Sequence, residues 1–256
     1  MSKLKITIIT ITYNSAKTVR TTFESVRRQK YENLEYLLID GGSQDDTLKI
    51  ANEYNDIITR IVSEPDEGIS DAMNKGIRLA TGDLIGIIHS DDALTDGALE
   101  RLADIWDGKT DVYYGDAIIM DESGKPTHIL CGKEDLSVLP YGFCLVHPAT
   151  FVRKTAYEKY GLFDKRYKCA MDYELLLRFY RSGAVFKYSH ENFAYFRSGG
   201  TNERYRKRTI DEVCEISIRH GGSRIKAHAI KCKKIAADRI RPLLGGVIHN
   251  KRVQKL

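Results

Sequence analysis

Short apolar segments alternate with amphipathic ones in the first half of the chain. The apolar segments are rich in β-branched residues, as buried strands are, and cover residues 5–11, 34–39, 57–62 and 84–88. The segments between them repeat apolar residues at helical spacing over residues 16–29, 47–54 and 70–80. Strands that alternate with helices in this way predict an α/β fold with a mostly parallel central sheet flanked by helices.

The second half has a less regular pattern. Helices are expected over residues 96–106 and 173–182, and strands over residues 111–115, 117–120 and 185–188. Beyond residue 204 the chain is typical of basic helices, with a narrow apolar stripe ended by Pro242. The stripe consists of Ile225, Ala229, Cys232, Ala236 and Ile240. We therefore expect one domain over residues 1–203 and a basic helical extension over residues 204–256.

Composition narrows the class of protein. Of the 256 residues, 42% are hydrophobic and 29% are charged, which is typical of a globular chain. No apolar run approaches the roughly 20 residues that span a bilayer, and the N-terminus lacks the pattern of a signal peptide. The five cysteines are scattered without a CxxC pair, which argues against a disulfide framework and a zinc site. These features predict a cytoplasmic protein.

The charges are distributed unevenly. Residues 204–256 contain 15 Lys or Arg against 4 Asp or Glu, whereas residues 1–203 contain 25 against 31. A basic extension favours an anionic partner, either a membrane surface or a nucleic acid. Residues 207–256 contain no Phe, Tyr or Trp, which argues against nucleic acid. The expectation is therefore an anionic membrane surface, and the alternative is a helical pair packed on the body with a solvated basic face.

An aspartate pair, Asp91 and Asp92, follows the fourth predicted strand. Open α/β sheets bind ligands beyond the carboxyl ends of their strands, so these acids lie where a site is expected. Hard oxygen ligands suit Mg²⁺ or Mn²⁺ bound together with phosphates. The alternative is that the pair only forms a turn or caps a helix.

Three further polar groups are candidates for ligand binding. Asp40 ends the second predicted strand before two glycines, and its carboxylate suits the imide or amine hydrogens of a nucleobase. Asp71, Asn74 and Lys75 share one face of a predicted helix, as ligands for ribose and phosphate would. Asp172 begins another helix and is a candidate general base. The alternative for Asp40 is turn formation, for the Asp71–Lys75 face a solvated helix surface, and for Asp172 helix capping. No GxGxxG motif follows the early strands, which argues against a dinucleotide-binding fold.

These motifs occur together in an order that resembles family 2 glycosyltransferases. They are Thr12-Tyr13-Asn14, Ile39-Asp40-Gly41-Gly42-Ser43, Ser63-Glu64-Pro65-Asp66-Glu67-Gly68, Asp71-Ala72-Met73-Asn74-Lys75-Gly76, Ala80-Thr81-Gly82-Asp83, Ser90-Asp91-Asp92 and Asp172-Tyr173-Glu174. The layout is most similar to the short members that build bacterial exopolysaccharide and O-antigen repeats, including the colanic acid type. The resemblance covers about residues 4–203 and implies the GT-A fold.

The resemblance also implies roles for individual residues. Donor binding is implied for Thr12, Tyr13, Asn14, Asp40, Asp71, Lys75 and Asp91, and Arg197 is implied as a phosphate partner in a Gly-Gly loop. Asp92 would ligate the metal and Asp172 would be the catalytic base. His147-Pro148 replaces a His-Gln pair of many relatives, and His89 stands where many carry Asn or an apolar residue. Both departures concern the expected acceptor pocket.

The implied reaction is metal-dependent and inverting. A sugar moves from a nucleotide-diphosphate donor to a hydroxyl of a saccharide acceptor, expected on a polyprenyl diphosphate at the inner face of the cytoplasmic membrane. Mn²⁺ or Mg²⁺ is the expected cofactor. Two alternatives remain open at this point: a sugar nucleotidyltransferase, which normally has a Gly-rich loop after the first strand, and a non-catalytic scaffold of a polysaccharide assembly.

Overall fold

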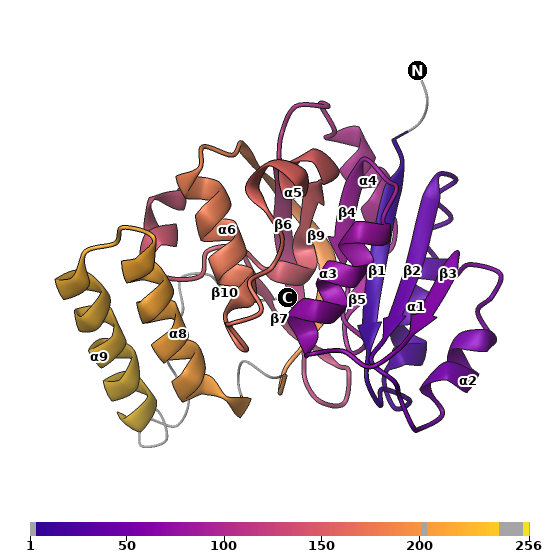
Figure 1. Cartoon of the computed structure of the whole chain (residues 1–256), viewed down its shortest axis with the longest axis horizontal. Helices are drawn as coiled ribbons and strands as arrows, with labels where there is room; N and C mark the ends of the chain where they lie inside the picture. Colours follow the sequence, from indigo (N-terminus) through magenta and orange to yellow (C-terminus); the bar gives the residue numbers. More distant parts are fainter. Residues whose placement is uncertain (1–3, 201–203, 241–252, 256) are drawn as a thin grey trace.

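The computed structural model describes residues 4–200, 204–240 and 253–255, and its centre is a curved sheet covered by helices (Figure 1). The strands are β1 (Ile6–Thr12), β2 (Leu34–Asp40), β3 (Arg60–Ser63), β4 (Leu84–Ile87), β5 (Ala93–Leu94), β6 (Val112–Met120), β7 (Pro126–Leu130), β8 (Thr150–Arg153), β9 (Phe186–Arg197) and β10 (Val253–Lys255). The helices are α1 (Val19–Arg27), α2 (Thr47–Asn52), α3 (Ile69–Leu79), α4 (Ala98–Asp104), α5 (Lys154–Tyr160), α6 (Met171–Arg181), α8 (Arg206–Arg219) and α9 (Arg224–Ile240), with the 3₁₀ helices η1 (Leu136–Tyr141) and η2 (His147–Ala149). These elements confirm the predicted α/β class.

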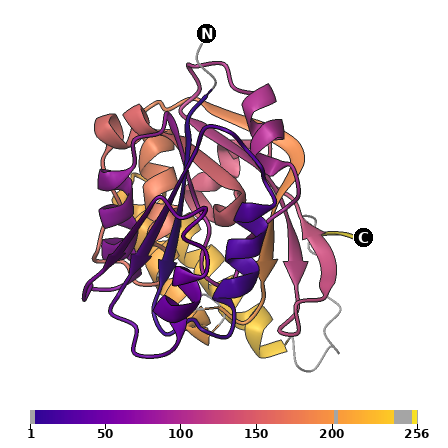
Figure 2. The same ribbon diagram turned by 90° about the vertical axis from the view of Figure 1, so that its right-hand side faces the viewer.

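The N-terminal half of the sheet is parallel, as predicted, and Figure 2 views the molecule from its side. Strands β3, β2, β1 and β4 are neighbours in that order. Alternate residues of β1 enter two different cores: Ile9 packs with Met73 of α3 on one face, and Ile8 packs with Phe23 of α1 on the other. Burial on both faces explains why these strands are continuously apolar in sequence.

The C-terminal half of the sheet is mixed. Strand β8 runs antiparallel to both β4 and β6, whereas β9 runs parallel to β6. The two strands expected at 111–115 and 117–120 form one strand, β6, and the strand expected at 185–188 extends to Arg197 as β9. A Cβ atom on Gly115 would lie 2.4 Å from the carbonyl oxygen of Glu191, so this glycine lets β9 pass close by and is no strand end.

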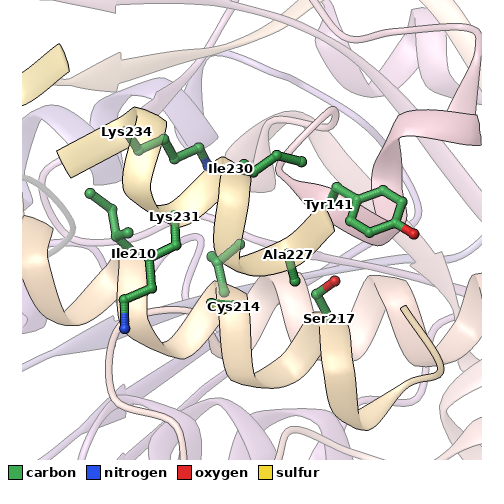
Figure 3. A pocket seen from close by; sticks show the side chains of 9 residues that line it. Tyr141, Ile210, Cys214, Ser217, Ala227, Ile230, Lys231 and Lys234 are labelled. Carbon is green, nitrogen blue, oxygen red and sulfur yellow. The ribbon is translucent and has the colours of Figure 1, made fainter. Parts of the chain in front are cut away.

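The basic extension forms two helices, as predicted, at the end of the molecule opposite β2 and β3 (Figure 1). The face of α9 that packs is not the apolar stripe noted in the sequence. Ala227 and Ile230 of α9 meet Ile210 and Cys214 of α8, leaving a gap of only about 10 Å³ (Figure 3). The positions of the predicted stripe that the structure describes, Ile225, Ala229, Cys232 and Ala236, are exposed, and Ile225 is 85% exposed.

Lysine stems account for this difference. Lys231 and Lys234 line the contact between α8 and α9 (Figure 3). Lys231 Nζ pairs with Asp211 at 2.7 Å, whereas the Nζ of Lys234 lies beside Gly142, where burial lowers its pKa. A pattern that counts lysine as polar therefore selects the wrong face. The expected helix stop at Pro242 lies outside the described residues. In the part of the chain that is described, no helix has both the length and the apolar character needed to cross a bilayer.

Helix α8 is joined to the main core. Val213 and Ile216 belong to the same apolar cluster as the α6 residues Leu175 and Phe179. The division at residue 203 remains a prediction, and it separates α8 from a core in which it participates.

Glu212 of α8 caps the start of α6. Its buried carboxylate accepts hydrogen bonds from the backbone N–H groups of Lys168, Cys169 and Ala170, and from Nε of Arg208. The helix has no side-chain cap of its own at Ala170. Burial disfavours the charged form of Glu212, but these donors outweigh it and hold the pKa of the carboxyl below its usual range.

Replacing Glu212 with alanine leaves these buried N–H donors without an acceptor. We expect Glu212→Ala to lower the free energy of unfolding by about 1–3 kcal/mol, measured by urea denaturation. Glu215→Ala, on an exposed position of the same helix, is the matched control and should change it by less than about 0.5 kcal/mol. Equal stability of the two variants would contradict the capping role.

Candidate functional site

The carboxyl ends of the parallel strands meet at one edge of the sheet and carry most of the predicted site residues. Thr12 ends β1 opposite Asp40, which ends β2, and Asp40 is opposite Ser63, which ends β3. The loop after β4 joins this edge because Ser90 Oγ lies 2.9 Å from Ser15 Oγ. The arrangement is the place where open α/β sheets bind ligands.

Asp40 lies beneath this edge rather than on it. It is fully buried, and its two oxygens accept five hydrogen bonds, from the hydroxyls of Thr12, Ser43 and Ser63 and from the N–H groups of Gly42 and Ser43. Burial opposes the charged form, but these donors hold the pKa of Asp40 below its usual range. The carboxylate of Asp40 is thus engaged by its own turn and strand ends, and a direct contact between Asp40 and a nucleobase stays a prediction.

The neighbouring turn carries two predicted donor-binding residues, Tyr13 and Asn14, and brings Asp66 close to them. The Tyr13 ring is 65% exposed, and Asn14 adopts a left-handed conformation (φ 49°) in which its N–H donates to Ser43 Oγ. Asp66 belongs to the 63–68 motif, and the resemblance implies no role for it. A Cβ on Gly41 would lie 2.4 Å from Asp66 Oδ2 and 3.5 Å from the Tyr13 ring, so the glycine makes room for both.

Asp71 and Lys75 share one face of α3, as predicted, and hold the preceding loop. Lys75 Nζ lies 2.9 Å from a Glu64 oxygen and 3.6 Å from Asp71 Oδ2. Burial works against ionisation of Asp71, but the Glu67 N–H and the nearby lysines lower its pKa. Asn74 does not join them: its amide exchanges two hydrogen bonds with the backbone of Phe163.

Asp92 and Arg197 connect the loop after β4 to the end of β9. Asp92 is 1% exposed, and its Oδ1 accepts the backbone N–H of Arg197. The guanidinium of Arg197 donates to the carbonyl oxygens of Asp91 and Glu122. Burial, reinforced by the charge of Asp91, raises the pKa of Asp92 well above its usual range.

Asp91 and Asp92 fit a divalent cation only with help from a ligand. A buried carboxylate with a raised pKa is stabilised by a neighbouring cation, so the donor chemistry is suitable. Among the described residues, however, no group of three or more His, Cys, Asp or Glu side chains has the arrangement of a metal site. A metal held here would complete its coordination with ligand oxygens and water, as Mg²⁺ sites commonly do.

Asp172 is the second residue of α6, directly after the segment that Glu212 caps. Its carboxylate accepts the N–H of Tyr173 at 2.8 Å, and burial raises its pKa to about 6. A carboxylate with this pKa is deprotonated at neutral pH and basic enough to take up a proton, as a general base requires. Asp172 follows Met171, which lines a pocket together with Gly68 and Ile69 at the start of α3.

Two histidines meet beside the aspartate pair. The rings of His89 and His147 lie 5.5 Å apart, and His147 also makes an edge contact with Phe163. Burial lowers the pKa of both, that of His147 to about 3, so both are neutral near pH 7. A neutral imidazole both donates and accepts hydrogen bonds, which suits sugar hydroxyls.

Comparison with known proteins agrees with this geometry. The family model described as "Glycosyl transferase family 2" matches residues 7–161. A "PGL/p-HBAD biosynthesis glycosyltransferase" of Mycobacterium bovis is 31% identical over 201 residues, covering 75% of this chain and 77% of the relative. An uncharacterized glycosyltransferase of Rickettsia prowazekii is 29% identical over 199 residues, covering 73% of this chain and 61% of the relative.

Solved structures show the same fold at lower identity. Mannosyltransferase PcManGT from Pyrobaculum calidifontis, in complex with GDP-Man and Mn²⁺, aligns with a TM-score of 0.66 and 16% identity over 95% of this chain and 72% of that chain. S. aureus TarS 1-349 in complex with UDP-GlcNAc aligns with a TM-score of 0.64 and 16% identity over 93% and 73%. These neighbours confirm the expected GT-A fold. From the family model and its relatives, we conclude that this chain belongs to glycosyl transferase family 2.

Proposed function

We propose that this glycosyltransferase moves a sugar from a nucleotide-diphosphate donor to a hydroxyl of a saccharide acceptor, with inversion at the anomeric carbon and with the help of Mn²⁺ or Mg²⁺. The observation that carries the proposal is the separation of two kinds of carboxylate. Asp172, with a pKa raised to about 6, begins α6, whereas the Asp91–Asp92 pair follows β4. The first suits proton transfer and the second suits a cation.

Donor binding is assigned to the edge formed by β1, β2 and β3. The exposed ring of Tyr13 offers a surface on which a base stacks, and Asp66 Oδ2 beside it suits an imide or amine hydrogen. Thr12, Asn14 and Asp40 hold this turn in place through the hydrogen bonds described above. Asp71 and Lys75 fix the 63–68 loop and face the ribose and diphosphate in this proposal.

The leaving diphosphate carries negative charge that must be stabilised. Asp92, with Asp91, would hold the metal ion, which supplies Lewis-acid stabilisation of that charge when bound. Lys75 and Arg197 add positive charge from α3 and β9. The solved relatives that contain GDP-Man with Mn²⁺ or UDP-GlcNAc support this class of donor.

Asp172 then acts on the acceptor. Its carboxylate takes the proton of the attacking hydroxyl as the oxygen bonds to the anomeric carbon, while the bond from that carbon to the diphosphate oxygen breaks. Attack on the face opposite the leaving group inverts the anomeric centre. Glu212 contributes by fixing the segment before α6, and the neutral His89 and His147 suit the acceptor hydroxyls.

The alternatives have less support. A sugar nucleotidyltransferase would carry a Gly-rich loop after β1, but residues 12–16 read Thr-Tyr-Asn-Ser-Ala. A scaffold would not need a buried carboxylate whose pKa is raised to about 6 at the start of α6.

The basic extension is assigned to an anionic membrane surface, where a polyprenyl-diphosphate-linked acceptor would lie. Its outward face supports this: Ile225, Ala229 and Cys232 are exposed on α9, and so are the cations Arg224, Lys233 and Arg239. Apolar residues between exposed cations suit the interface of an anionic leaflet. The enzyme would then work in the cytoplasm on the inner face of the membrane.

The pH dependence of turnover tests the base. We expect kcat/KM to decrease as the pH is lowered through an apparent pKa of about 6, because Asp172 must be deprotonated to accept the proton. Asp172→Asn should lower kcat by about 10²–10⁴-fold and leave nucleotide binding intact. Glu158→Gln, on the exposed side of α5, is the control. A variant at position 172 that retains more than a few per cent of turnover would refute the assignment.

Thermal unfolding with UDP, GDP, dTDP or CMP, each with and without Mn²⁺, tests the donor site. One nucleotide at about 100 times its Kd should add about 2.7 kcal/mol of stability, and this gain should depend on the metal. Asp92→Asn keeps an acceptor for the Arg197 N–H but removes the charge, so it should lose the metal-dependent gain without loss of stability in the metal-free protein.

Asp96→Asn, an exposed position four residues further on, should keep the full metal-dependent gain. A gain that survives in Asp92→Asn would show that Asp92 is no metal ligand, and the same measurement on Asp91→Asn would then identify the ligand. Absence of any gain in the parent protein would oppose the transferase proposal.

Sedimentation with vesicles containing 30% phosphatidylglycerol tests the membrane assignment. Reversing Arg224, Lys233 and Arg239 to Glu should weaken binding by at least about 100-fold, since each cation contributes about 1 kcal/mol near an anionic surface. Reversing the exposed Lys17, Lys49 and Lys109 of the body changes net charge equally and should have a much smaller effect. An equal loss in both variants would indicate binding through net charge alone.

A further inference from the structure

A pocket of about 230 Å³ lies where the start of α3, the segment before α6 and the start of α8 meet. The residues that matter for its chemistry are Gly68, Ser70, Lys168, Met171, Tyr205 and Arg208. A single buried water needs only about 10–15 Å³ by the same measure, so the pocket accommodates a much larger group. None of the donor-binding residues proposed above lines it.

The first helical turn of α3 opens toward this pocket without a cap. Its N-cap is Gly68, which has no side chain to accept the first N–H groups of the helix. Gly68 has a φ of +111°, and a Cβ there would lie 3.7 Å from Lys168 Nζ. The uncapped end of an 11-residue helix carries partial positive charge and favours an anion.

Ser70 provides an independent sign of a missing partner. It is 5% exposed and lines the pocket, and its hydroxyl has no hydrogen-bond partner. A buried hydroxyl without a partner is unfavourable because it loses its hydrogen bonds to water. A ligand oxygen in the pocket would supply that partner.

Two cations complete the pocket. Lys168 Nζ donates to the carbonyl oxygen of Glu67 at 3.2 Å, and no carboxylate of the described ranges lies within 4.0 Å of it. Arg208 has only its Nε bonded to Glu212 and is half exposed. The nearby carboxylates are already paired: Glu67 with Lys165, Asp71 with Lys165 and Lys75, and Glu212 with Arg208 and three N–H groups.

We propose that this pocket binds a phosphate group of the acceptor, the diphosphate that joins the saccharide to its lipid carrier. The proposal rests on the transferase function proposed above. Met171 in the pocket wall precedes the base Asp172, so an acceptor anchored by its phosphate here has its sugar near that base. Arg208 belongs to α8 and Tyr205 directly precedes that helix, so the basic extension forms one wall of the proposed acceptor site.

Calorimetric titration of the full chain with inorganic pyrophosphate in the absence of divalent metal tests the pocket. Lys168→Met and Ser70→Leu, which removes the hydroxyl and fills the space, should each weaken binding at least tenfold. Lys49→Met, an exposed lysine of α2, is the charge-matched control, and Lys75→Met reports on the donor side. Lys49→Met should bind as the parent does, and Lys75→Met should lose only the binding that the donor site contributes.

Unchanged binding in the two pocket variants overturns the proposal, as does a parent protein that does not bind pyrophosphate. Loss of binding in Lys75→Met alone would place the anion at the donor site and overturn it equally. If instead no nucleoside diphosphate with Mn²⁺ stabilises the parent while pyrophosphate still binds through Lys168, the transferase proposal fails and the anion pocket stands.

A second measurement identifies the source of the phosphate. Phosphatidylcholine vesicles containing 2% undecaprenyl diphosphate should bind the parent more tightly than vesicles without it, and Lys168→Met should lose this difference. Stabilisation by a nucleoside diphosphate with Mn²⁺ should be the same in parent and Lys168→Met. The opposite pattern, in which only nucleotide binding is lost, would assign the pocket to the donor and refute an acceptor role.

Discussion

The carboxylate of Asp40 ties together the ends of three parallel strands. It accepts hydroxyl hydrogen bonds from Thr12 at the end of β1 and from Ser63 at the end of β3, while itself ending β2. Because the three strands are in parallel register, one buried anion with enough donors fixes the loops that follow all of them. The exposed Tyr13, the 40–44 turn and the 63–68 loop are all arranged around it, and the proposed donor site depends on that arrangement.

Three aspartates, Asp40, Asp92 and the partly exposed Asp172, differ because their hydrogen-bond donors differ. Asp40 has five donors and a lowered pKa, whereas Asp92 has the N–H of Arg197 and a neighbouring charge, and its pKa is raised. Asp172 has only a local N–H and a pKa of about 6. Burial penalises each charge, and the number of donors decides the outcome. Asp40 therefore holds the strand ends together, Asp92 suits a cation, and Asp172 suits proton transfer.

The basic extension is part of the working molecule. Glu212 caps the segment that leads into Asp172, and Val213 and Ile216 pack into the main core. Arg208 of the same helix, α8, lines the pocket beside α3, and so does the exposed Tyr205, which directly precedes α8. Helix α8 thus connects the proposed base, the core and the proposed anion pocket, while α9 packs against α8 and turns a cationic face outward.

Elements whose burial is local and periodic could be predicted from the order of residues alone. The apolar runs of β1, β2 and β4, the helix of Asp71 and Lys75, and the order of polar motifs at strand ends were all predictable, because each depends on neighbours in the chain. Which groups meet, in contrast, follows from the packing of segments that are distant in the chain. The saturation of Asp40, the approach of Asp66 to Gly41 and the passage of β9 over Gly115 depend on contacts between distant segments. The packing face of α9 includes Lys231 and Lys234, whose aliphatic stems line the contact with α8, and a pattern of polar and apolar letters does not record this.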